Sequence, residues 1–562
     1  MAVSSPFPRV RAAAGGLPSR LRTAYGLRAL AGETNLAMLV ACAVSLGLMV
    51  RLQYVLAAAG LPINDGGMFF AMAEDICRAG YALPEYTSYN GGAIPFAYSP
   101  LGSYLAAVLA DVGVLSVMDS LRFLPLLASV LTIPAFFLLA RAVLRERRLV
   151  LLATFLFALS PRAYNWEIAG GGLTRSFGFL FAVLAIYYLY RMTREPSALR
   201  TVVATALVAL TALFHLEMAV FAGISYLVIL GGYGRTRRHL LQAAAVASGA
   251  ALLTAPWWGT VIAQHGLEPF LAASQTGKHS LVAPLRLLFF DYTQEPFLPL
   301  LALLGLIGAL GCLASRQYFL PAWLVVLFAL DPRKAPTDAA VPLAMLAAVG
   351  TLAVLLPQLE RLREAGSRVL APSRWVAALP VFFVLYLFLS SATAPRMESS
   401  PLRAMSRQDV EMMRWARANT PADSRFLILA ASERELWTVD AVSEWFPALT
   451  GRVSLATVQG TEWLRDDRGM VASIERYEDL KVCGDRDPGC LDAWAREAGV
   501  GYTHVYVGKA PDEGGAWLAS EGLVPRRDCC AALRAELAAS AAYDLVYDGE
   551  NGQIFALQPS LP

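Results

Sequence analysis

Ionisable side chains stand where long apolar runs of this chain end, a position at which a charge is costly unless it is paired or used. Asp65 follows the apolar run 36–59, and Glu167 follows the run 149–166. A carboxylate partly shielded from water has a raised pKa and can accept the proton of an attacking hydroxyl. We therefore predict Asp65 as a general base and Glu167 as a second catalytic candidate. Asp65 also precedes an amphipathic segment, GGMFFAMAEDI, which it could simply cap.

Basic side chains near the same run ends could bind a phosphate and stabilise charge on a departing one. Arg51 lies inside the first run, so it needs a partner such as a lipid phosphate or a nearby carboxylate. Arg333 and Lys334 could equally anchor a helix end by snorkelling. The candidates for phosphate binding are Arg51, Lys278, Arg286, Arg333 and Lys334.

Other polar residues near these charges could line a pocket or contact an acceptor. His215 and Glu217 occupy FHLEM, a tight turn between two apolar runs, and they could also be merely hydrated there. Glycines punctuate the same loops and permit close approach, but no Gly-Lys-Ser/Thr loop or HExxH motif is present. The predicted pocket residues are Tyr98, Arg175, His215 and Glu217.

The composition is that of an integral membrane protein. Hydrophobic residues make up 56% of the 562 and charged residues 16%, and the mean hydropathy is +0.49. Soluble domains carry roughly 25% charged residues. The net charge of +3 is too small to indicate a nucleic-acid partner. Apolar runs near the length that crosses a bilayer predict eleven spans: 36–59, 121–143, 149–166, 174–192, 200–214, 217–232, 240–262, 296–315, 318–331, 337–356 and 375–392.

The distribution of basic residues predicts the orientation of these spans. If the short stretch 99–115 lies in the interface and the N-terminus is cytoplasmic, twenty basic residues fall inside and eight fall outside before the tail. Letting 99–115 span reverses this bias, so we expect an interfacial helix there. The predicted organisation is a cytoplasmic arm 1–35, a membrane domain 36–392 with an outer loop 60–120 carrying interfacial helices, and an extracytoplasmic tail 393–562. We expect a bacterial inner-membrane protein.

The tail reads as one α/β domain with a mixed or antiparallel sheet. Its candidate strands include YTHVYVG and the closing pair YDLVYDG and GQIFALQ. Glu444, Trp445 and Trp463 could recognise an acceptor, or the tryptophans could be core residues. An exported domain meets an oxidising compartment, so one or two disulfides are plausible, with three pairings open. The cysteines concerned are Cys483, Cys490, Cys529 and Cys530.

The ordered set of features resembles the GT-C superfamily of membrane glycosyltransferases. The features are an N-in first helix, an outer loop opening with an Asp, the interfacial string YSPLGSYLAA, and LARAVLRERRLVLLATFLFALSP at 139–161. The resemblance covers residues from about 36 to 356. Within this superfamily, the chain resembles in particular glycosyltransferase family 39, the protein mannosyltransferase and aminoarabinose transferase-like group.

The resemblance implies site residues as well as a fold. Asp65 resembles the family's catalytic carboxylate, and this chain has Gly66 where many members have a second acid. GGGLTRS, after Glu167, is faintly similar to an oligosaccharyltransferase loop whose acids hold a divalent metal, so a metal is left open. The tail lacks the Trp-Trp-Asp-Tyr-Gly motif, and its nearest string is SEWFPALTG. Transfer of a whole oligosaccharide to asparagine is therefore not expected.

The expected activity is sugar transfer from a polyprenyl-phosphate donor to an exported glycan, lipid or protein, on the outer face and with inversion. Membrane lipid is a further expected partner. Two alternatives stand beside it. A transporter or flippase for lipid-linked sugars would share the bundle and the outer cations, although no half-to-half repeat is evident. A non-catalytic assembly protein could keep the fold without the chemistry.

Overall fold

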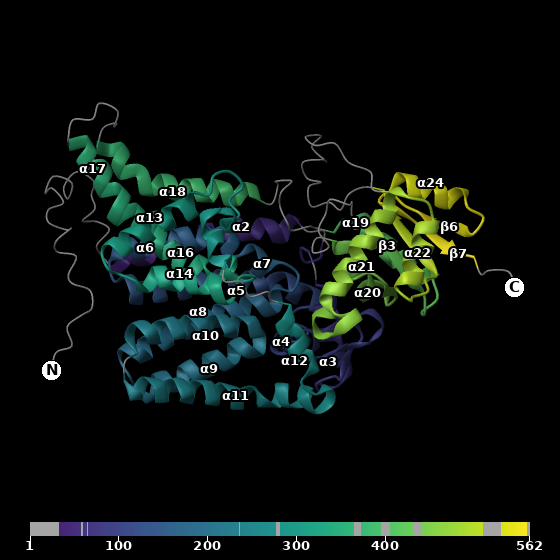
Figure 1. The fold of residues 1–562 in the computed structure, drawn as a ribbon, viewed down its shortest axis with the longest axis horizontal. Coiled ribbons are helices and arrows are strands. Elements are labelled where there is room, and N and C mark those ends of the chain that lie inside the picture. The colour runs from purple at the N-terminus through teal and green to yellow at the C-terminus, as the bar shows by residue number, and fades with distance from the viewer. Residues whose placement is uncertain are drawn as a thin grey trace.

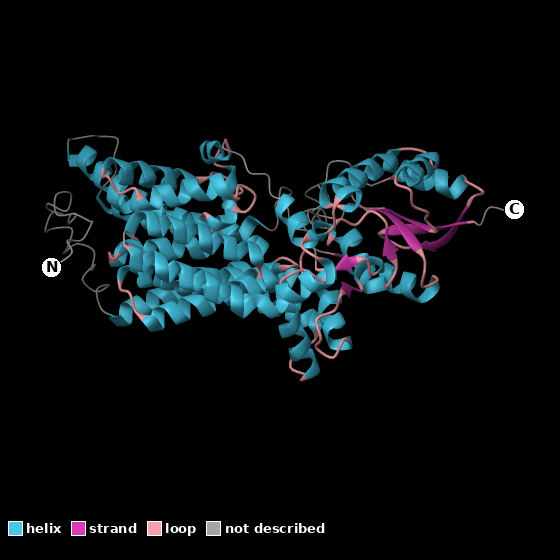
Figure 2. Cartoon of the chain, turned by 60° about the horizontal axis from the view of Figure 1, so that its bottom comes forward, coloured by secondary structure: helices cyan, strands magenta, loops and turns pink. Residues whose placement is uncertain are grey.

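The computed structural model describes residues 33–57, 60–64, 66–234, 236–276, 282–364, 373–394, 405–430, 440–509 and 530–558. Long helices fill one end of the molecule, and a sheet with its own helices occupies the other end (Figure 1). Figure 2 shows the strands gathered at the end that carries the C-terminus. The predicted fold class, a membrane helical bundle with a C-terminal α/β domain, is confirmed.

Each predicted span overlaps a helix. Among the described residues, six helices are long and apolar enough to cross a membrane, and the others are shorter. The chain is a multi-pass membrane protein. The bundle helices are α2 (Glu33–Ala57), α5 (Val117–Leu144), α6 (Arg147–Leu159), α8 (Gly172–Arg194), α9 (Ala198–Phe214), α10 (Leu216–Tyr233), α11 (Arg237–His265), α13 (Leu300–Ala314), α14 (Phe319–Leu330), α16 (Ala340–Val349), α17 (Leu356–Glu364) and α18 (Ser373–Thr393).

The predicted span 149–166 is wrong at its C-terminal end. Helix α6 ends at Leu159, and a 3₁₀ turn, Pro161–Ala163, separates it from the short helix α7 (Asn165–Ile168). Pro161 has no N–H to donate to the preceding turn, and the residue before a proline is driven out of the helical region. Glu167 is therefore on a separate short helix beyond the end of α6.

The outer loop contains the elements that position the site. They are α3 (Gly67–Arg78), β1 (Tyr86–Thr87), β2 (Ile94–Pro95) and α4 (Leu101–Asp111). Strands β1 and β2 pair antiparallel. Helix α4 is the helix predicted within 99–115. The N-cap of α3 is Gly66, with no side-chain capping bond, and Asp65, whose alternative role is to cap this helix, lies outside the described residues.

Small residues let the bundle helices approach closely. A Cβ on Gly308 of α13 would lie 1.9 Å from the carbonyl oxygen of Leu346 in α16. A Cβ on Gly350 would lie 2.2 Å from the carbonyl oxygen of Leu304. Because lipid is as apolar as a helix surface, such close packing is what associates membrane helices. The α13–α16 contact thus depends on glycine at both positions.

The C-terminal sheet has the order β4-β3-β5-β7-β6. Strand β3 runs parallel to both β4 and β5, whereas β7 runs antiparallel to β5 and β6, so the sheet is mixed as expected. Its elements are α19 (Arg407–Asn419), β3 (Arg425–Leu429), α20 (Ala441–Thr450), β4 (Val453–Ser454), α21 (Met470–Val482), α22 (Gly489–Glu497), β5 (His504–Gly508), α24 (Ala531–Ala539), β6 (Tyr543–Asp548) and β7 (Gly552–Leu557).

Both faces of this sheet are covered, since alternate residues of a strand point to opposite sides. Phe426 and Ile428 join a core with α19, α20 and the outer-loop helix α3. Leu427 and Leu429 join a second core with α21, α22 and α24. One face of the C-terminal domain therefore shares a hydrophobic core with the loop that follows the first membrane helix.

Candidate active site

Two loops that carry the predicted acids are joined at the end of the bundle. Asp65 itself lies outside the described residues. Two residues before it, the carbonyl oxygen of Ile63 accepts a hydrogen bond of 2.6 Å from the backbone N–H of Gly170. Immediately after it, a Cβ on Gly66 would lie 3.3 Å from the Cα of Gly170. The loop of Asp65 and the loop of Glu167 are thus in backbone contact, which the glycine-rich string 170–172 permits.

Glu167 is a buried acid without a hydrogen-bonded partner. It is 1% exposed, and neither carboxylate oxygen has a hydrogen-bond partner among the described residues. Burial raises the pKa of Glu167, while the nearby charges of Lys334, Arg175 and Arg162 oppose that rise. A raised pKa makes a carboxylate a stronger base, which suits a residue that takes a proton from a hydroxyl.

Basic residues predicted from the sequence lie near Glu167 and near a second acid, Glu217. Lys334 Nζ lies 3.3 Å from Glu217 Oε2, and Arg333 Nη1 lies 3.9 Å from Glu217 Oε1. Arg175, from the first turn of α8, interacts electrostatically with Glu167. Arg286 acts on Arg162, which burial holds at a lowered pKa of about 10. The structure therefore brings together most of the charged residues predicted from separate loops.

Tyr98 and His215 form the uncharged side of the same region. The Tyr98 ring packs edge-on against Phe69 at 4.9 Å, Trp463 at 5.7 Å and His215 at 5.8 Å between centroids. Burial, with Lys334 nearby, lowers the pKa of His215 to about 3, so its imidazole is neutral at pH 7. Tyr98 links the outer loop, the α9–α10 turn and the C-terminal domain at one point.

Besides Asp331, two members of this cluster were not predicted as site residues. Asp338, at the end of α15 (Ala335–Asp338), is 1% exposed, and both its oxygens lack hydrogen-bond partners among the described residues. Burial raises its pKa well above the usual range. Arg162 is the other. We call the whole set the ionic cluster: Arg162, Glu167, Arg175, Glu217, Arg286, Asp331, Arg333, Lys334 and Asp338.

Two predicted phosphate ligands are not in the ionic cluster. Lys278 lies outside the described residues. Arg51 is fully buried within the bundle, where it donates to Ser129 Oγ at 2.9 Å and to the carbonyl oxygen of Ala158 at 2.7 Å. Its guanidinium also lies 4.3 Å from the centre of the Tyr164 ring. Serine, carbonyl and aromatic groups thus take the place of the phosphate or carboxylate expected for Arg51, and we do not retain it in the site.

The described residues do not form a metal site. They contain no group of three or more His, Cys, Asp or Glu side chains arranged to hold an ion. The two free carboxyls, Glu167 and Asp338, instead lie among cations, since Lys334 acts on both. A positive environment suits an anion better than a divalent cation, and we derive no step through a metal.

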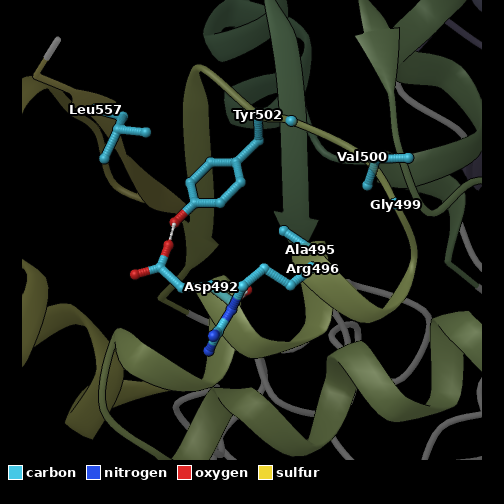
Figure 3. Close-up of a pocket in the computed structure, with 8 residues that line it drawn as sticks. Asp492, Ala495, Arg496, Gly499, Val500, Tyr502 and Leu557 are labelled. Carbon is cyan, nitrogen blue, oxygen red and sulfur yellow. Dashed lines mark hydrogen bonds between the residues drawn. The ribbon is translucent and has the colours of Figure 1, made fainter. Parts of the chain in front are cut away.

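The two hollows described lie outside the ionic cluster. One, of about 10 Å³, is lined by the residues before Asp65, including Leu61, Pro62 and Ile63, and it is large enough for about one water. The other, of about 450 Å³, is in the C-terminal domain between α22, the loop before β5 and the end of β7. There the Tyr502 hydroxyl donates to Asp492, as Figure 3 shows. Neither hollow includes a member of the cluster.

No protein-family model matches the chain, and no curated protein sequence does. Solved structures do match. The oligosaccharyltransferase of Archaeoglobus fulgidus has 14% identity over 86% of this chain and 71% of its own, with a TM-score of 0.54. ArnT from Cupriavidus metallidurans has 13% identity over 92% and 97%, with a TM-score of 0.51. The mycobacterial arabinofuranosyltransferase AftD has 15% identity over 93% and 40%, with a TM-score of 0.53.

These three neighbours are membrane glycosyltransferases of the GT-C superfamily. The bundle, the outer loop and the C-terminal α/β domain of this chain therefore have the GT-C fold, and the predicted resemblance is confirmed at the level of fold. This chain spans about two fifths of the length of AftD and nearly all of the length of ArnT.

Proposed function

We propose that this protein is a membrane glycosyltransferase that moves a sugar from a polyprenyl-phosphate donor to an exported glycan, lipid or protein. The ionic cluster carries this proposal. Lys334 acts on two buried acids, Glu167 and Asp338, whose pKa values are raised and which lack hydrogen-bond partners among the described residues. Four further basic side chains belong to the same cluster. Protonation of Glu167 and Asp338 would leave a strongly positive region at the end of the bundle, suited to a lipid phosphate.

The proposed reaction is a single displacement with inversion. The oxygen of an acceptor hydroxyl attacks the anomeric carbon, and the bond from that carbon to the phosphate oxygen breaks. The phosphate leaves with the electron pair, and the hydroxyl proton passes to Asp65. Lys334, Arg333, Arg175 and Arg286 are the proposed partners of the departing phosphate, which charge-assisted hydrogen bonds would stabilise.

Glu167 is the second acid of the proposed site. Its loop is hydrogen-bonded to the loop of Asp65 through Gly170 and Ile63. It serves in this proposal to hold the acceptor hydroxyl beside Asp65. Tyr98, His215 and Glu217 are proposed to line the space for the sugar or the acceptor.

We also propose that the site faces the outside of a bacterial inner membrane. The excess of basic residues on the opposite side supports this orientation. A disulfide joins Cys483 to Cys490 in the C-terminal domain, and disulfides persist in oxidising compartments. Cys529 lies outside the described residues, so the second expected pairing is not described.

A transfer assay with the full chain tests the function. The purified protein in lipid nanodiscs is given radiolabelled polyprenyl-phosphate sugars and a membrane extract as acceptor. We expect label to move to the acceptor, and Asp65→Asn to reduce the rate about 10²- to 10⁴-fold, the usual contribution of a general base. Asp111→Asn is the control, since Asp111 is an exposed acid of the same outer loop.

Two outcomes would contradict the proposal. Label that crosses between leaflets without reaching an acceptor would identify a flippase. Absence of both transfer and crossing with every polyprenyl-phosphate sugar supplied would favour a non-catalytic protein. Full activity of Asp65→Asn with loss in Glu167→Gln would keep the transferase and move the base to Glu167.

A further inference from the structure

The C-terminal domain holds the residues on both sides of Asp65. Before it, the carbonyl oxygen of Asn64 accepts a hydrogen bond of 2.8 Å from the indole Nε1 of Trp445. After it, the backbone N–H of Met68 donates to the side-chain oxygen of Gln459 at 3.1 Å. All of these groups are buried. In Figure 1 the helix that carries Trp445, α20, lies close to α3, which begins just after Asp65.

Trp445 occupies the space that a side chain at position 66 would need. A Cβ on Gly66 would lie 2.6 Å from Cζ2 of Trp445, and one on Gly67 would lie 2.4 Å from the carbonyl oxygen of Glu444. Gly66 also has a φ of 156°, a value that side chains disfavour. The indole therefore fits against a bare backbone, at the position where many GT-C members carry a second acid.

The indole is itself fixed from several sides. It is 0% exposed, and its Nε1 is already bonded to the carbonyl oxygen of Asn64. The adjacent Glu444 accepts hydrogen bonds from the backbone N–H groups of Val458 and Gln459, at 3.2 Å each. The Tyr89 hydroxyl, from the outer loop, donates to the carbonyl oxygen of Glu444 at 2.6 Å. Of the two roles considered for Trp445, these contacts support the core residue.

We infer that Trp445 is a positioning residue that fixes the backbone on both sides of Asp65. We call the contacts of Trp445 with Asn64 and Gly66 the clamp. The clamp rests on these contacts alone, whereas the role of Asp65 as the base rests on the proposed function. A base must be held within a fraction of an ångström of its substrate, and a displacement of about 1 Å can cost about 10²-fold in rate. The C-terminal domain thus completes the active loop rather than serving only as a lid.

Trp445→Phe and Trp445→Ala test the clamp, and Trp494→Phe is a matched control. Trp494 is also a buried tryptophan of the C-terminal domain whose Nε1 donates to a backbone carbonyl, that of Arg476, at 2.8 Å. Hydrogen exchange of residues 60–70 is measured in the full chain in nanodiscs. We expect faster exchange in Trp445→Ala, a smaller increase in Trp445→Phe, which keeps a ring, and none in Trp494→Phe.

Kinetics then separate positioning from general stability. In the transfer assay, we expect Trp445→Ala to lower kcat about 10- to 100-fold with the donor KM changed less than about twofold. Trp445→Phe should recover part of that loss. A change in KM alone, or equal losses in Trp494→Phe, would overturn the inference.

A double-mutant cycle tests the contact with Gly66. Gly66→Ala in the wild type brings a Cβ against the indole, whereas in Trp445→Ala that space is open, and the backbone strain at position 66 is common to both. We expect the two substitutions to be non-additive in hydrogen exchange, and additive effects would overturn the contact. If the wild type transfers no sugar, the proposed function fails while exchange still decides the clamp. If the variants loosen the loop and leave kcat intact, only the positioning role fails.

Discussion

Buried carboxylates in the two halves of this molecule differ in how they are paired. In the C-terminal domain, Asp440 accepts from the backbone N–H of Ser443 at 3.0 Å and from the Tyr477 hydroxyl at 2.6 Å. Asp409 accepts from Ser406 and from Asn551. In the ionic cluster, Glu167 and Asp338 are equally buried, but they have no such bonds among the described residues.

The difference separates two uses of a buried acid. Removing a carboxylate from water is expensive, and hydrogen bonds recover much of the cost. Asp409 and Asp440 recover it within the fold, where Asp440 also caps α20. Glu167 and Asp338 have only nearby positive charge to stabilise their ionised forms. A buried acid whose desolvation free energy is not offset by hydrogen bonds is typical of sites that bind a ligand or catalyse a reaction.

The largest expected effect is on transfer by Glu167→Gln. The substitution keeps the shape of the side chain and removes its ability to accept a proton. If Glu167 shares the catalytic work with Asp65, the rate in the transfer assay falls about 10²-fold or more while the protein stays folded. Glu146→Gln, at an exposed position before α6, is the control. Unchanged transfer in Glu167→Gln would show that Glu167, like Asp409 and Asp440, has no catalytic role.

The next effect is on lipid binding by Lys334→Met. This change removes the ammonium group that lies 3.3 Å from Glu217 and acts on both free acids. Loss of one charge-assisted contact with a phosphate weakens binding of undecaprenyl phosphate about 10- to 100-fold. Binding of undecaprenol, which lacks the phosphate, should not change. Lys509→Met, which breaks an ion pair with Asp548 in the other half of the molecule, is the control.

Stability should respond in the opposite sense to the two kinds of acid. Asp440→Asn replaces an acceptor with a group that cannot satisfy both Ser443 and Tyr477. We expect the free energy of opening at α20 to fall by about 1–3 kcal/mol, as read from hydrogen exchange. Asp338→Asn removes a buried carboxyl that lacks such bonds, so stability near α15 should stay the same or rise. A comparable fall in the free energy of opening in both variants would show that the two kinds of buried acid stabilise the fold alike.

The smallest effect is on the pH dependence of stability. Because burial raises the pKa of Glu167 above 4.5, its contribution to stability is fully present below about pH 4.5 and declines as the pH rises through its folded pKa. Because burial lowers the pKa of His215 from 6.5 to about 3, its contribution is present above pH 6.5 and declines as the pH falls towards 3. Thermal unfolding is measured for Glu167→Gln and His215→Gln across this pH range. Each substitution should remove the pH dependence of stability that its own residue contributes.

Much of the fold could be predicted because apolar run length reports directly on membrane helices. The charged residues around DPRKAPTD and NWEIAGGGLTRS were also found, since ionisable groups at run ends are conspicuous. Arg51 was misread because its partners, Ser129 and Ala158, are distant in sequence and carry no charge. Asp338 belongs to the same string, but the sequence does not show that it is buried and lacks hydrogen-bond partners among the described residues. A pattern along one segment does not contain the contacts made across the fold.

The bond between Trp445 and Asn64 joins positions 381 residues apart. The loop after the first membrane helix is among the earliest parts of the chain to be synthesised, and its support is among the last. Contacts of such long sequence separation form late in folding. A chain that stops short of α20 would lack the hydrogen bond from Trp445 to Asn64, so the support of that loop depends on synthesis reaching α20.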